Sequence, residues 1–70
     1  MAQVPPTSLE QTARVIADSA EIAHGLAAVS EQQGEPDHVA LFTRVAREAE
    51  ARVERLRELD AQIRATRPTT

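Results

Sequence analysis

The chain has 70 residues, a net charge of −3 and a hydrophobic fraction of 41%, and 13 of its residues are alanine. A chain of this length forms at most one domain, and so small a domain buries too little surface to be stable by a wide margin. Apart from the alanines and the terminal Met1 and Val4, only 14 apolar side chains remain to build a core. The absence of cysteine excludes disulfides and thiolate metal sites as stabilising devices.

The charges are divided unevenly between the two halves of the chain. Residues 1–35 hold one arginine and five acidic residues, whereas residues 36–70 hold seven arginines and six acidic residues. An acidic chain without a basic tract lacks the electrostatic surface that attracts nucleic acid or anionic lipid. The arginines of the second half are interleaved with glutamates, and there is no exposed aromatic side chain on which a base would stack. We therefore expect neither nucleic acid nor a membrane among the partners.

The N-terminal sequence gives an expectation about location. Its first eight residues are polar and contain two prolines, unlike the charged and then apolar pattern of a signal peptide. The longest apolar runs have four residues, far fewer than a membrane span needs. These features predict a cytoplasmic protein.

The first predicted element is a helix over residues 8–33. Two prolines in the preceding residues predict an extended tail over 1–7, and the segment Thr7 to Glu10 matches a capping box, in which the two side chains satisfy backbone N–H groups. Gly34 is placed to end this helix in the left-handed conformation.

A second helix is predicted over residues 37–66, after a connection over 34–37. Pro36 suits the first turn of a helix, where its missing N–H costs nothing, and Pro68 would stop the helix before a short tail over 68–70. A short connection makes neighbouring helices antiparallel. The predicted fold class is therefore all-α, with an antiparallel two-helix hairpin as its single domain over residues 8–67.

Apolar periodicity marks the faces of both helices. On the first helix one stripe contains Val15, Ser19, Ile22, Leu26 and Val29, and a small-residue stripe beside it contains Ile16, Ala20, Ala23 and Ala27. On the second helix a 3-4 spacing joins Phe42, Val45, Ala49, Arg52, Leu56, Leu59 and Ile63, with Ala46 and Val53 alongside. Such a spacing over about three heptads is typical of a coiled-coil seam.

A lone hairpin has one seam between its helices, yet the apolar arc of the first helix is wide enough for two. Pairing two hairpins into a four-helix bundle would bury the remaining stripe, and homodimers are the commonest oligomers. We therefore predict a non-enzymatic protein–protein interaction or structural module that acts as a homodimer. The alternative is a subunit of a heteromer, such as a regulator or an antitoxin-like partner, that completes its bundle on binding. The predicted interface residues are Val15, Ile16, Ile22, Leu26, Val29, Phe42, Val45, Ala49, Arg52, Val53, Leu56, Leu59, Asp60 and Ile63.

Two of these interface residues, Arg52 and Asp60, are charged. One interpretation places both at the margins of the seam, where they reach water. In the other, the second helix packs antiparallel on its symmetry mate about a two-fold axis at Leu56, so that Arg52 of each copy pairs with Asp60 of the other. The sequence leaves both interpretations open, along with the parallel or antiparallel topology of the bundle.

The only motif that suggests chemistry is the E-x-x-H of Glu21 and His24. In di-iron bundles two such motifs combine with two further glutamates, and all of them project into the bundle. Here the helical wheel puts Glu21 opposite the apolar arc and His24 at its edge, which predicts a surface pair and no metal. The chain has no lysine, tyrosine or cysteine and no glycine-rich loop, so we expect no enzymatic activity, cofactor or small-molecule substrate.

Overall fold

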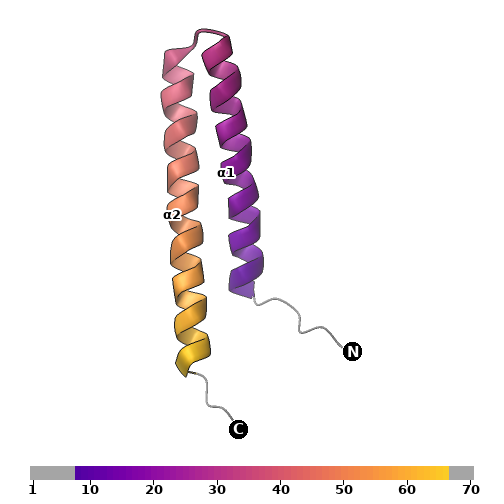
Figure 1. The fold of residues 1–70 in the computed structure, drawn as a ribbon, viewed down its shortest axis with the longest axis vertical. Coiled ribbons are helices and arrows are strands. Elements are labelled where there is room, and N and C mark those ends of the chain that lie inside the picture. The colour runs from indigo at the N-terminus through magenta and orange to yellow at the C-terminus, as the bar shows by residue number, and fades with distance from the viewer. Residues whose placement is uncertain (1–7, 67–70) are drawn as a thin grey trace, which may run out of the picture.

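The computed structural model describes residues 8–66, which form two helices joined by one turn (Figure 1). Helix α1 spans Ser8–Gln32 and helix α2 spans Pro36–Thr66. The helices lie side by side and antiparallel in a single layer, and the end of α2 extends beyond the start of α1 (Figure 1). This arrangement confirms the predicted all-α hairpin. The tails predicted over 1–7 and 68–70 lie outside the described residues.

The turn has the geometry that its sequence predicts. Gly34 adopts a φ of 72°, the left-handed conformation that glycine enters without a steric penalty. Its N–H donates to the carbonyl of Glu31 at 3.1 Å, and the N–H of Glu35 donates to the carbonyl of Ser30 at 2.9 Å. This pair of hydrogen bonds is the Schellman motif that ends a helix. Because Pro36 already has helical geometry, α2 begins one residue earlier than predicted, and α1 ends one residue earlier.

Glu10 forms ion pairs at the open end of the hairpin, where α1 starts. The predicted capping box requires Thr7, which lies outside the described residues. Within them, Oε1 of Glu10 lies 3.2 Å from Nη2 of Arg14, and Oε2 of Glu10 lies 3.6 Å from Nη2 of Arg64 on α2. The second contact joins the helices where α1 starts.

The seam between the two helices has small residues at nearly all of its buried positions, and the larger Ile16, Phe42 and Leu56 are half-buried beside them. Its buried members are Ala13, Ala20, Ala23, Ala27 and Ser30 on α1 and Ala46, Ala49 and Val53 on α2. Within each set the buried residues follow at intervals of three, four or seven, the spacing that keeps one face of a helix toward its neighbour. Small side chains let two helices approach closely, but they bury little apolar surface. Among the described residues no large side chain is fully buried.

The seam on α2 differs from the predicted stripe. The prediction joined two neighbouring columns of the helix, and only one of them faces α1. Ala49 and Val53 are buried against α1, whereas Val45, Arg52 and Ile63 are exposed. The reason lies in the partner helix. The buried alanines of α1 face Ala46, Ala49 and Val53 of α2, and in this rotation Val45 and Arg52 lie outside the seam.

Candidate functional site

One face of the hairpin is apolar and has no covering layer. Seven large apolar side chains in the described region are exposed by 43 to 65%. Those exposed residues are Val15, Ile22, Leu26, Val29, Leu41, Val45 and Ile63. All lie in or next to the two stripes that adjoin the alanine seam, and Ile63, four residues after Leu59, is the one nearest the C-terminal end of α2.

Helix geometry gathers these stripes on one side of the molecule. On α1, Val15, Ile22 and Val29 are seven residues apart, about a third of a turn round the helix from the seam. On α2, Val45 and Leu59 flank Arg52 at the same spacing and on the matching side of their seam. Because the helices are antiparallel, the two stripes fall on the same face of the hairpin. We call this surface the apolar face, and it comprises Val15, Ser19, Ile22, Leu26, Val29, Leu41, Val45, Arg52 and Leu59.

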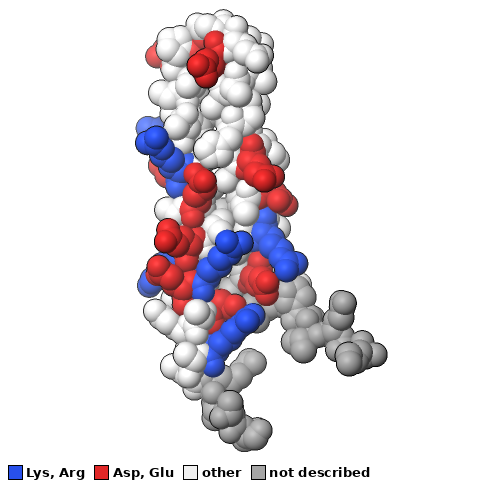
Figure 2. Space-filling model, in the orientation of Figure 1, with Lys and Arg blue, Asp and Glu red and all other residues white. Residues whose placement is uncertain are grey.

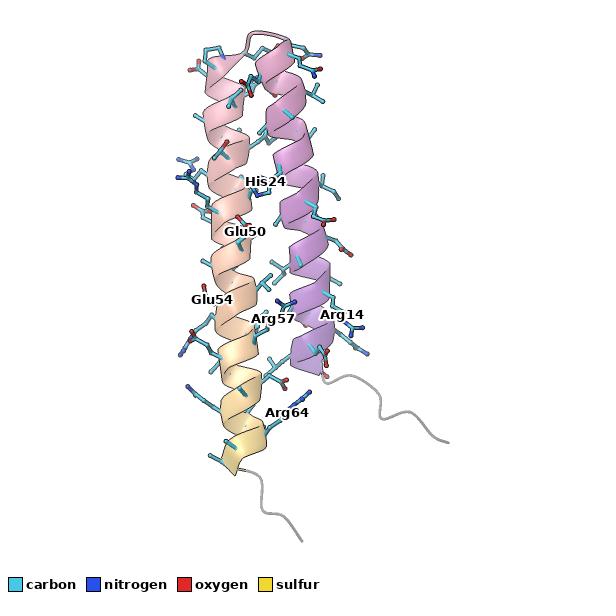
Figure 3. The ribbon with its side chains drawn as sticks, viewed as in Figure 1. Arg14, His24, Glu50, Glu54, Arg57 and Arg64 are labelled. Atoms are coloured by element: carbon cyan, nitrogen blue, oxygen red, sulfur yellow. The ribbon has the colours of Figure 1, made fainter. Side chains whose placement is uncertain are left out.

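The opposite surface, which we call the charged face, carries ionisable groups from both helices. His24 and Glu50 point toward one another across the hairpin (Figure 3), with Nε2 of His24 3.3 Å from Oε1 of Glu50. They lie on a groove of about 660 Å³ over the seam. Its lining consists of Ala17, Ala20, Glu21, His24, Glu50, Val53, Glu54, Arg57, Glu58 and Ala61. Charged side chains of both signs cover the half of the hairpin away from the turn (Figure 2).

The residues of the E-x-x-H motif lie on this charged face. Glu21 lines the groove, while His24 pairs with Glu50 of the other helix. Both residues are exposed, as the helical wheel predicts for a surface position. Among residues 8–66 no group of three or more histidine and acidic side chains is arranged to hold a metal ion. All buried side-chain polar atoms in this part of the chain have hydrogen-bond partners.

The two charged residues of the predicted interface occupy different surroundings. Arg52 is exposed on the apolar face and forms no ion pair within the described part of the chain. Asp60 lies at the edge of the seam with its side chain 15% exposed, and its Oδ2 lies 3.2 Å from Nε of Arg64. The pairing of Arg52 with Asp60 of a second copy stays a prediction, and it would compete with the Arg64 contact.

The structure divides the predicted interface residues into two groups. Those buried or half-buried at the seam within the hairpin are Ile16, Phe42, Ala49, Val53, Leu56 and Asp60. Those on the apolar face are Val15, Ile22, Leu26, Val29, Val45, Arg52 and Leu59, with Ile63 near the end of α2. The prediction missed Leu41, although its position four residues before Val45 places it in the same exposed stripe.

Comparison with protein-family models, with curated proteins and with solved structures gives no match. Neither described helix combines the length and the apolar character needed to cross a membrane.

Proposed function

We propose that this protein is a non-enzymatic helical module that acts by protein–protein association, and that its principal partner is a second copy of itself. The observation that carries the proposal is the apolar face. It leaves seven of the 14 larger apolar side chains of residues 8–66 exposed by 43 to 65%, while alanines occupy six of the eight buried positions. Two packed layers are the usual minimum for a hydrophobic core, and the hairpin supplies one.

The energetics favour covering this face. Fully burying an aliphatic side chain is worth about 1.5–3 kcal/mol, so covering the exposed half of one gains roughly 1 kcal/mol. In a symmetric dimer every such gain occurs twice. A second hairpin would therefore supply the missing layer and produce a four-helix bundle, with each apolar face covering the other.

A second copy is favoured over an unrelated helix by the shape and composition of the face. Both helices contribute a stripe of similar length, so two hairpins match each other along their whole overlap. A two-fold interface also needs only one surface, which must be complementary to itself. The acidic balance of residues 1–35 supports the alternative, a heteromer in which α1 lies beside a basic partner.

The test is sedimentation equilibrium of the full chain over a wide concentration range, with helical circular dichroism measured on the same samples. We expect a helical dimer. Leu26→Glu on the apolar face should weaken it by at least about a hundredfold in Kd, because each dimer would bury two added charges. Ala28→Glu adds the same charge at an exposed position outside the apolar face, and it should leave the Kd within about threefold.

The outcomes separate the two candidates. A wild-type chain that is monomeric and only partly helical at every concentration would overturn the homodimer and favour the heteromer. A dimer that is weakened equally by both substitutions would place the interface elsewhere than the apolar face.

A further inference from the structure

The groove on the charged face has an apolar floor and an acidic rim. The floor consists of Ala17, Ala20, Val53 and Ala61, and two of these side chains are buried. Four glutamates and one arginine line the sides together with His24, so negative charge predominates. Because the floor residues are small, a third helix laid along the groove could approach both helices of the hairpin closely.

Three of the glutamates form a row along α2. Glu50, Glu54 and Glu58 follow at intervals of four residues, so they are about 6 Å apart along the helix axis and extend over about 12 Å. On the other side of the groove α1 contributes Glu21. Carboxylates on both sides of an apolar floor are complementary to a helix that carries cations along the edges of an apolar stripe.

These carboxylates are accessible to a partner because the hairpin engages few of them. Glu21 and Glu54 are exposed, and neither forms an ion pair or a side-chain hydrogen bond within residues 8–66. Glu50 and Glu58 each have one contact, to a side chain that is itself more than half exposed. Exposed pairs of this kind are worth little, so they do not prevent a carboxylate from binding another cation.

Arg57 is the one residue of the groove that opposes a basic partner. It follows Glu50 and Glu54 along α2 (Figure 3), and it forms no ion pair in the described part of the chain. Its guanidinium reduces the negative charge of the groove. Removal of this cation should therefore strengthen the binding of a basic partner, an effect that a loss of structure would not produce.

We propose that the groove docks a helix of another protein, one that carries arginine or lysine at every fourth position beside a stripe of small apolar residues. Such a helix places its cations about 6 Å apart, the spacing of the glutamate row. A second copy lacks this pattern, because every arginine of α2 has an acidic residue three or four positions away and α1 contains a single arginine. The groove lies on the opposite side of the hairpin from the apolar face, so this docking leaves the dimer interface free.

A synthetic helix supplies the probe. An alanine peptide of about 20 residues with arginine at every fourth position is a good helix former and spans the whole glutamate row. Fluorescence anisotropy of the labelled peptide measures its Kd for the full chain at about 50 mM salt, where surface charges are weakly screened. The control peptide has the same composition but distributes its arginines around the helix, and it should bind at least about fivefold more weakly.

Substitutions in the groove identify the docking site. Glu54→Gln should weaken peptide binding about threefold, and the double variant Glu21→Gln with Glu54→Gln should weaken it about tenfold. Arg57→Gln should instead tighten binding about threefold. Glu31→Gln removes the same charge from an exposed residue outside the groove, near the turn, and it should leave the Kd within about 1.5-fold of wild type.

Several outcomes would overturn this docking site. They are the absence of peptide binding, equal affinity for the two peptides, equal weakening by Glu31→Gln and Glu54→Gln, and no gain in Arg57→Gln. Sedimentation equilibrium with saturating peptide separates the groove from the apolar face. We expect the dimer to persist with peptide bound, whereas a dimer that the peptide dissociates would place the peptide on the apolar face. A chain that binds the peptide as a monomer would overturn the homodimer and leave the docking site standing.

Discussion

The two faces of the hairpin share the same helices and differ in how their side chains meet water. On the charged face His24 reaches Glu50 across the hairpin, and the surrounding glutamates and Arg57 remain hydrated. On the apolar face the exposed side chains are aliphatic apart from Ser19 and Arg52, and among residues 8–66 no hydrogen bond or ion pair joins the two helices there. The charged face is stable as it stands, whereas the apolar face carries a hydration cost that a covering layer would remove.

The difference originates in the seam between the faces. Alanine occupies six of the eight buried positions, so the helices pack closely and the larger residues are displaced to one side. If the buried positions held leucines, the large apolar side chains would lie between the two helices, and no apolar face would remain for a second layer to cover. The alanine seam thus creates the apolar face, and enlarging it should be the most damaging single change.

Ala46→Leu tests the seam, because Ala46 is 0% exposed and three added carbon atoms have no space between the helices. Overpacking of this kind costs about 1–3 kcal/mol, and it should reduce the free energy of unfolding by that amount. Urea unfolding followed by circular dichroism measures the change. Ala51→Leu makes the same substitution at an exposed position of α2, and its effect should stay within about 0.5 kcal/mol. Equal losses in both variants would contradict the alanine seam.

Much of this architecture could be predicted from the sequence, because its signals are local. Gly34 and Pro36 mark the ends of the two helices, and the required φ of 72° occurs at Gly34. The stripe of Val15, Ile22 and Val29 follows from helical periodicity alone. These features depend on residues close in sequence, so no knowledge of the partner helix is needed.

The rotation of α2 could not be predicted in the same way. Val45 and Ala46 are adjacent, and each continues an acceptable 3-4 pattern. The pattern of α2 alone does not show which of the two faces α1. In the structure Ala46 lies at the seam, opposite the small residues of α1, and Val45 faces outward. The contact of His24 with Glu50 could not be predicted for the same reason, since it depends on which sides of the two helices meet.

The two glycines offer a smaller test of where the apolar face ends. Gly34→Ala forces a β-carbon into the left-handed conformation and should cost about 1 kcal/mol of unfolding free energy. Gly25→Ala should instead stabilise α1 by about 0.5–1 kcal/mol, because a β-carbon there meets no atom within 4 Å. Urea unfolding at two protein concentrations measures both changes. If Gly25→Ala weakened the dimer, the covering layer would extend past the apolar face and onto this position.

The smallest effect is expected on the charged face, where His24→Gln removes the ring that approaches Glu50. Both side chains are more than half exposed, and exposed ion pairs are worth about 0.2–1 kcal/mol at most. The unfolding free energy should therefore fall by no more than about 0.5 kcal/mol, and the dimer Kd should stay within about twofold. Glu54→Gln, at a groove residue that makes no ion pair in the described part of the chain, is the matched control. If His24→Gln weakened the dimer and Glu54→Gln did not, the charged face would be the dimer interface. A substitution on a surface that contacts only water should leave the Kd unchanged.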